Sequence, residues 1–359
     1  MKLATYKDGS RDGQLIVVSR DLRTAHYATG IAHRLQQVLD DWGFLAPQLQ
    51  DVYDALNAGR ARHVFDFNPE QCMAPLPRAY QWLNGTAYPS HAELTQRALG
   101  LEPVAPGLSP AMYQGSGDDF LGPCDDVAVL SDAMGVDFGA GLAVVTADVR
   151  LGTSPEDALD AVRLLTVVDR ISLRQLAQAE LDKQCGWVQS KPATAFAPVA
   201  VTLDEVGEAW RHGRVHLTLQ TSWNGRKVGM CDAGADMGFH FGQLIAHAAA
   251  TRHLRAGTVV GCGTVANAVV DKKGNLDWPK GYGCIADKRG MEILQNGEAK
   301  TDYLQLGDSV RIDMKGKDGA SLCGAIDHNL VSVQEVRTRR TRVAAAAAAA
   351  EPAAEAEPV

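Results

Sequence analysis

The most constraining feature of the chain is a strand-like segment that begins with two glycines at alternate positions. Residues 142–149 are mostly apolar and rich in β-branched side chains, which is typical of a buried strand. Gly139 and Gly141 come just before, and residues two apart in an extended chain point to the same face. Two gaps therefore lie side by side. Either another backbone comes close there, as at a bulge, or side chains are missing from a site.

Composition excludes several classes of protein. The chain has 359 residues, of which 46% are hydrophobic, and a net charge of −8. This charge argues against a nucleic-acid-binding protein, which needs clustered Lys and Arg; the only basic run, residues 337–342, lies beside a low-complexity tail. No stretch of about twenty apolar residues is present, and residues 1–13 are polar. We expect a soluble, cytoplasmic protein without membrane contact.

Cysteine spacing gives no sign of a disulfide framework or a zinc site. The seven cysteines are an odd number, are widely scattered and form no C-x-x-C pair. We expect reduced, mostly buried thiols that pack as small hydrophobic side chains.

The chain divides into a small front unit, a large domain and a tail. Residues 1–75 predict a small α+β domain, with strands at 3–7, 15–19 and 24–29 and helices at 31–42 and 47–56. A proline-containing junction at 72–78 leads to a large, mainly β domain over 79–333. Residues 337–359 are rich in Ala, Glu and Pro, and we expect them to be disordered.

Within the large domain, local signals predict three features. Asn224-Gly225 is a two-residue turn signal, which predicts a hairpin over 215–230. Apolar residues at helical spacing predict a helix over 235–254. Residues 304–314 and 319–326 are expected to be strands joined by a turn at 315–318.

Four segments bring polar side chains next to apolar strands. They are WLNGTAYPSH at 82–91, DRISLR at 169–174 after the apolar run 164–168, QSKPATAF at 189–196, and GCIADKR at 283–289. One carboxylate at a strand end is as often a cap or turn former as a catalytic group. Only the four segments together indicate a site.

In this order the segments resemble the fumarylacetoacetate hydrolase family. Further matching stretches are YQGSGDDFLGP at 113–123, residues 189–198, WNGRKVG at 223–229, FHFGQLI at 239–245 and GTVAN at 263–267. The resemblance covers about residues 80–330, and the front unit resembles the N-terminal domain of one bacterial branch. It implies an α+β, mainly β fold, a mixed β-sandwich or roll, with an active site at one mouth and usually a homodimer.

The resemblance also implies residue roles for a small anionic substrate, a 1,3-dicarbonyl or 2-oxo acid. His91 falls on the water-activating histidine, and Asp287 replaces the glutamate that orients it. Lys191 matches the catalytic lysine and Arg174 a nearby substrate arginine. Tyr88 and Thr264 match substrate-binding positions.

The metal site departs from the family. The resemblance implies an Mg²⁺ or Ca²⁺ ion held by four carboxylates, which polarises the substrate oxygens. Here Asp169 is the only carboxylate at these positions, because Asn84 stands at the first aspartate and Gly139 and Gly141 at a Glu-x-Glu pair. We expect no tightly bound metal, although one could bind weakly together with substrate.

Three hypotheses follow. The first is a family-type enzyme, acting by C–C bond hydrolysis, tautomerisation or decarboxylation, in which Lys191 and Arg174 take over the electrostatic role of the ion. The second is a non-catalytic relative that binds an anionic metabolite or a protein partner. The third is an Mg²⁺ enzyme with a depleted ligand set. We favour catalysis of some kind over pure binding, because a pure binder has no need of His91, Asp287 and Lys191 together.

Overall fold

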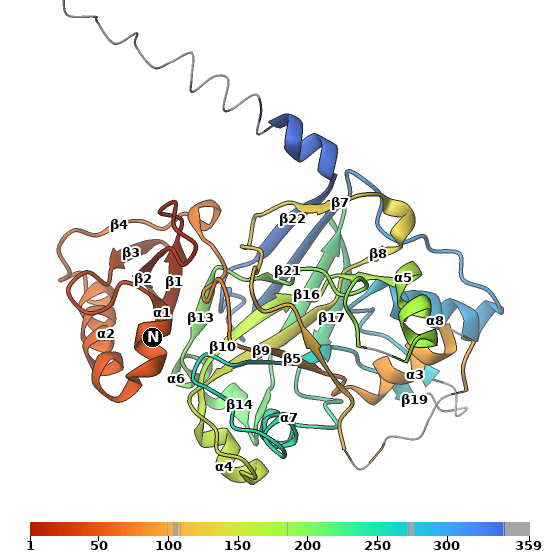
Figure 1. Ribbon diagram of the computed structural model, residues 1–359, viewed down its shortest axis with the longest axis horizontal. Coiled ribbons are helices and arrows are strands. Elements are labelled where there is room, and N and C mark those ends of the chain that lie inside the picture. Colours follow the sequence, from red (N-terminus) through yellow and green to blue (C-terminus); the bar gives the residue numbers. More distant parts are fainter. Residues whose placement is uncertain are drawn as a thin grey trace, which may run out of the picture.

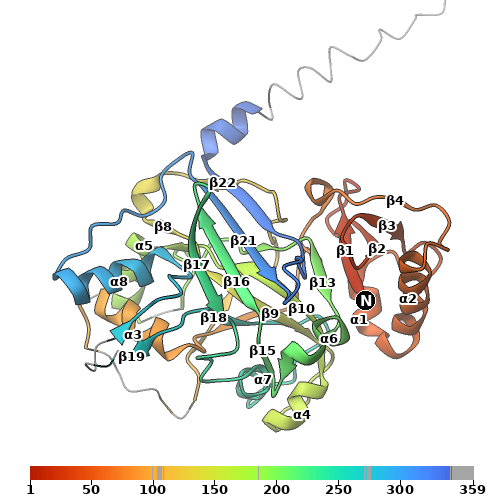
Figure 2. The same ribbon diagram turned by 180° about the vertical axis from the view of Figure 1, so that it is seen from behind.

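The computed structural model describes residues 1–98, 100–102, 107, 109–184, 186–270, 272, 276–339 and 341. It is a mixed fold of two main sheets with helices around them (Figures 1 and 2). Within the described residues, no helix combines the length and the apolar character that a membrane span requires.

The larger sheet runs in the order β4-β3-β2-β1-β13-β10-β9-β18-β5-β6, with β12 paired to β10. Its strands are β1 (Lys2–Tyr6), β2 (Gln14–Val18), β3 (Thr24–Tyr27), β4 (Phe65–Asp66), β5 (Trp82–Gly85), β6 (Met112–Gly115), β9 (Ala140–Thr146), β10 (Val162–Asp169), β12 (Ala195–Phe196), β13 (Val199–Val201) and β18 (Val259–Thr264).

The second sheet runs in the order β17-β16-β21-β22-β7, and its apolar face packs on β9 and β10. It consists of β7 (Val127–Val129), β16 (Thr218–Trp223), β17 (Arg226–Asp232), β21 (Ser309–Lys315) and β22 (Ile326–Ser332). Three two-stranded pairs complete the strands: β8 (Val136–Asp137) with β11 (Ser172–Leu173), β14 (Trp210–Arg211) with β15 (Arg214–Val215), and β19 (Val269–Val270) with β20 (Leu276–Asp277).

The helices lie around the two sheets (Figure 1). They are α1 (Leu35–Asp40), α2 (Trp42–Asn57), α3 (Pro89–Ala98), α4 (Pro155–Asp160), α5 (Arg174–Asp182), α6 (Leu203–Val206), α7 (Phe241–Ala248) and α8 (Ile285–Asn296), with short 3₁₀ turns η1 (Pro69–Gln71), η2 (Asp132–Met134) and η3 (Gly207–Ala209).

The front unit is joined to the large domain by strand pairing. β1, β2 and β3 and the helices α1 and α2 follow the predicted order, whereas β4 was not predicted. α2 begins five residues earlier than expected and contains Pro47. β1 pairs antiparallel with β13, with Lys2 opposite Val201. The strands of the front unit therefore extend the larger sheet (Figure 2).

The hairpin was predicted correctly from the residues of its turn. Asn224 and Gly225 both have positive φ and connect β16 to β17, so the predicted hairpin is confirmed. The helix predicted over 235–254 is shorter. The amides of Gly234 and Ala235 bind the Asp232 carboxylate, and Leu254 pairs with Val149 in a β-bridge, so both ends of the segment are held out of the helix.

The last two strands are displaced along the chain from their predicted positions. β21 starts at Ser309, because the Asp308 carboxylate accepts the Gln305 amide in a turn. The prediction of a strand over 319–326 is wrong except at its final residue, since Gly319 and Gly324 have positive φ and β22 begins only at Ile326.

Residues 333–339 are helical, so the start of the expected disordered tail is ordered; its positions 340 and 342–359 lie outside the described residues.

The two glycines of the opening segment lie where backbones come close. Gly141 is on β9 between β10 and β18, and Gly139 comes directly before this strand. A Cβ atom on Gly141 would lie 2.4 Å from the carbonyl oxygen of Gly263, and one on Gly139 would lie 2.8 Å from that of Arg170. A side chain fits at neither position unless the neighbouring backbone moves.

We expect Gly141→Ala to destabilise the protein by about 1–3 kcal/mol, because its methyl group would meet a backbone oxygen rather than a flexible side chain. Gly43→Ala is the matched control, since Gly43 lies in α2 with no atom near its Cβ position, and alanine favours a helix. Urea unfolding of both variants tests this. Equal stability of Gly141→Ala and the parent protein would contradict it.

Candidate active site

A cavity of about 440 Å³ lies between α3, α5 and the loop that carries Lys191. Its wall includes His91, Arg170, Arg174 and Lys191. These residues come from different parts of the chain: His91 is on α3, which follows β5; Arg170 follows β10; and Arg174 begins α5. The fold therefore brings together three of the residues predicted from sequence and one, Arg170, that was not.

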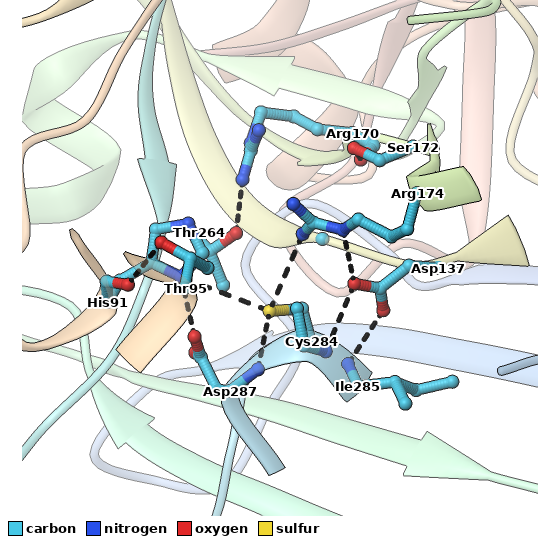
Figure 3. A network of polar contacts seen from close by, with 12 residues as sticks. His91, Thr95, Asp137, Arg170, Ser172, Arg174, Thr264, Cys284, Ile285 and Asp287 are labelled. Atoms are coloured by element: carbon cyan, nitrogen blue, oxygen red, sulfur yellow. Dashed lines mark hydrogen bonds and ion pairs between the residues drawn. The ribbon is translucent and has the colours of Figure 1, made fainter. Parts of the chain in front are cut away.

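His91 and Asp287 form a buried dyad, in which the imidazole Nδ1 lies 2.6 Å from the carboxylate Oδ1 (Figure 3). The Asp287 side chain is fully buried, and that of His91 is 8% exposed. Asp287 lies in the first turn of α8, where a negative charge is favourable. An ionised Asp287 assigns the proton to Nδ1, which leaves Nε2 as a proton acceptor. This arrangement suits general acid–base chemistry.

Arg174 is held in place by Asp137, a residue that the sequence analysis missed. The Arg174 Nε donates to Asp137 Oδ2 at 2.9 Å, and the same carboxylate accepts the amides of Ile285 and Ala286 at 2.6 and 3.1 Å (Figure 3). Burial raises the pKa of Asp137, while Arg174 and the two amides oppose this shift. Asp137 thus connects the substrate-side arginine to the start of α8.

We expect Asp137→Asn to destabilise the protein by about 3 kcal/mol, because it leaves a mostly buried guanidinium without its charge partner. Asp327→Asn is the control, since it breaks the Arg311–Asp327 pair, in which both side chains are about half exposed, and should change stability by less than about 1 kcal/mol. Thermal unfolding checks the difference. Similar losses in the two variants would show that Asp137 does not act as a buried partner.

Within the described residues, Lys191 forms no ion pair with a carboxylate. Its Nζ donates to Ser172 Oγ at 2.8 Å and lies 5.1 Å from the centre of the Tyr113 ring and 5.9 Å from that of Trp187. Burial lowers the pKa of Lys191 well below its usual range, and the nearby Arg174 and Arg170 lower it further. The charged form of this lysine is therefore costly without a bound anion.

Arg170 was not predicted from sequence. It is 5% exposed and lines the cavity, and its Nη2 donates to Thr264 Oγ1 (Figure 3). Its Nε is buried without a hydrogen-bond partner, and no described carboxylate forms an ion pair with it. The sequence signal was a charged residue directly after the buried run of β10.

The other predicted site residues lie behind this wall or away from it. Thr264 is fully buried and reaches the cavity only through Arg170. The Tyr88 hydroxyl donates to the Ala233 carbonyl at 2.5 Å inside the core, so the structure does not bring Tyr88 to the cavity. Asp169 is also fully buried and outside the cavity wall.

The residues at the predicted metal positions do not fit a divalent ion. Asp169 Oδ1 accepts the Gly139 amide at 2.7 Å and Oδ2 lies 2.8 Å from His328 Nε2, so both oxygens already have partners. The Asn84 amide binds backbone groups of Gly263 and Gly85. Mg²⁺ and Ca²⁺ require six or more oxygen ligands, and the two glycines offer no side-chain oxygen.

A different group of possible ligand atoms occurs around the dyad. Among the described residues, His91, Cys284 and Asp287 place one potential metal ligand each within 4.8 Å of one another. Burial raises the pKa of the Cys284 thiol well above its usual value, and Asp287 and Asp137 raise it further. The thiolate that a metal needs is thus disfavoured, and His91 Nδ1 already bonds Asp287. This group fits a hydrogen-bond network better than a metal site.

The six cysteines within the described residues are free thiols, in agreement with the expectation, and five of them are buried. Cys185 lies outside the described residues.

Comparisons with known proteins agree with this fold. Residues 1–78 match the family model described as fumarylacetoacetase N-terminal domain 2, and residues 81–328 match fumarylacetoacetate (FAA) hydrolase C-terminal. A search of curated proteins found no match.

Solved structures similar in fold include three relatives of low sequence identity. Fumarylacetoacetate hydrolase from Exiguobacterium antarcticum has a TM-score of 0.61 at 17% identity, covering 92% of this chain and 99% of that one. Maleylpyruvate hydrolase from Sphingobium sp. SYK-6, solved with manganese (II) and pyruvate, has 0.60 at 16%, with the same coverage. 5-carboxymethyl-2-hydroxymuconate delta-isomerase from Mycobacterium smegmatis has 0.55 at 15%, again covering 92% and 99%.

Proposed function

The chain belongs to the fumarylacetoacetate hydrolase family, and we propose that it is an enzyme acting on a small anionic 1,3-dicarbonyl or 2-oxo acid. The supporting observation is the His91–Asp287 dyad at a cavity whose wall carries several cations. The reaction is C–C bond hydrolysis, tautomerisation or decarboxylation, without a tightly bound metal. A homodimer and a cytoplasmic location belong to the same proposal and rest on the family and on the composition.

For hydrolysis, the residues have the following roles. His91 Nε2 takes a proton from water, and Asp287 stabilises the imidazolium that forms. The water oxygen attacks the ketone carbon, and the C–C bond breaks with its electron pair on the departing enolate. Lys191 and Arg174 stabilise the developing negative charge, and the imidazolium returns the proton to the enolate carbon. The products are a carboxylic acid and a ketone, so one water is consumed.

The test is turnover by the purified protein of fumarylpyruvate, a simple acylpyruvate and oxaloacetate, each with EDTA present. We expect at least one substrate to be consumed with EDTA, and His91→Ala to abolish this activity. No turnover of any of the three by the parent protein, with or without added Mg²⁺, would overturn the assignment as an enzyme of this type.

A second candidate is a non-catalytic relative that binds an anionic metabolite. The observation in its favour is that Asp169, the one carboxylate at the predicted metal positions, is fully used by protein donors. This candidate predicts binding of the same acids without turnover. Activity lost in Lys191→Ala would exclude it.

A further inference from the structure

We propose that Arg170 is a built-in anchor for the substrate's 2-oxo-carboxylate group, so that this chain binds such anions through a guanidinium without a metal ion. The inference deepens the proposed function, on which it rests, because it names the group of the substrate that the cavity recognises. Arg170 has no assigned role in the sequence analysis or in the reaction scheme above.

Arg170 carries a positive charge that no described carboxylate balances. A buried cation is normally paired, because desolvation of an isolated charge costs several kcal/mol. Arg174 follows this rule, since Asp137 accepts its Nε at 2.9 Å. Arg170 is 5% exposed, and among the described residues its guanidinium bonds only the neutral Thr264 hydroxyl, while its Nε has no partner. An anion in the cavity would supply the missing partner.

The cavity wall is strongly cationic. Four cationic side chains line it: Arg170, Arg174, Lys191 and Arg289. No Asp or Glu among the described residues does so. Asp137, which does not line the cavity, neutralises Arg174. The remaining positive charge selects an anion, and about 440 Å³ suits a small molecule rather than a macromolecule.

Arg170 lies beside Gly139. Its Nη2 lies 3.3 Å from where a Cβ atom of Gly139 would be, so the guanidinium is next to the place where a side chain at this position would begin. This is one of the positions at which the family resemblance places an ion ligand. A guanidinium there provides positive charge together with a planar fork of donors, which matches two neighbouring oxygens of an oxo acid.

The experiment is calorimetric titration of oxalate, a stable mimic of a 2-oxo-carboxylate, in EDTA. We expect the parent protein to bind oxalate, Arg170→Gln to bind at least 100-fold more weakly, and Arg170→Lys at least 10-fold more weakly, because lysine keeps the charge but loses the fork. Arg311→Gln, an exposed arginine of the second sheet, is the charge-matched control and should bind normally. Thermal unfolding verifies that each variant is folded. If Arg170→Gln is not folded, the test rests on Arg170→Lys.

Three results would overturn the inference: oxalate binding that requires added Mg²⁺ or Mn²⁺, normal affinity in a folded Arg170 variant, or equal affinity for oxalate and sulfate. The outcome is separable from that of the proposed function. Metal-free oxalate binding that depends on Arg170, but without turnover, supports the anchor and refutes catalysis. Turnover that depends on added metal and is insensitive to Arg170→Lys supports catalysis and refutes the anchor.

Discussion

Replacement of His91 by alanine is expected to lower turnover of the responsive 2-oxo or 1,3-dicarbonyl acid by about 10²–10⁴-fold. His91 lies on the cavity wall, and its Nδ1 is fixed at 2.6 Å from the buried Asp287 carboxylate. Its Nε2 is therefore left for proton transfer. Steady-state kinetics at saturating substrate measure the effect. The loss should appear in kcat rather than KM, because the proton moves only during the reaction.

Two variants accompany this experiment. His33→Ala removes an exposed histidine of the front unit and should leave turnover unchanged. Asp287→Asn should also lower kcat, because an amide in place of the carboxylate no longer stabilises the imidazolium and can favour the wrong tautomer. Unchanged turnover in His91→Ala would mean that the dyad is only a buried polar pair of the core.

The second large effect is expected at Lys191, where activity and stability should change in opposite directions. Lys191→Met should lower kcat by about 10²–10³-fold, because it removes a cation placed to stabilise developing negative charge. The same change should stabilise the folded protein by about 1–2 kcal/mol near neutral pH, because it removes a partly buried charge that pairs with no carboxylate among the described residues.

The pH dependence of this stability gain follows from the direction of the shift. The pKa of Lys191 is lowered in the folded protein, first by burial and then by Arg174 and Arg170, so the unfolded chain binds the proton more tightly. The penalty is therefore fully present below the folded pKa, and it disappears as pH rises towards the unfolded value near 10.5. Thermal unfolding of Lys191→Met and the parent protein between pH 6 and 10 should show a difference that shrinks with pH. A constant or growing difference would contradict this.

The parts of the fold that could be predicted from sequence are those that a few neighbouring residues determine. The turn at Asn224-Gly225 requires positive φ at both residues, so it identified the hairpin without any tertiary context. The C-terminal end of α7 was missed because a contact between distant segments decides it, the bridge of Leu254 to Val149. The start of β22 was missed because Gly319 and Gly324 adopt positive φ, which the apolar pattern of the segment does not reveal. The join between β1 and β13 was also invisible, because nearly 200 residues separate the partners.

The site was predicted in part for the same reason. His91, Arg174 and Lys191 were found through a family pattern and do lie on one cavity. The local signal of Asp137 and Arg170 is ambiguous, because each is a single charged residue next to apolar ones, where a cap or a solvent-facing group is equally expected. Their roles become clear only in the structure, which shows that both side chains are buried, that Asp137 pairs with Arg174, and that Arg170 has no described carboxylate partner.

The pairing of β1 with β13 has a consequence for the whole molecule. β13 is short and buried, and without the first strand its outer edge would expose unpaired amide and carbonyl groups, an arrangement that invites association with other chains. The front unit thus covers this edge of the larger sheet, although it contributes nothing to the cavity wall. We expect an isolated large domain, with that edge uncovered, to associate with other chains more readily.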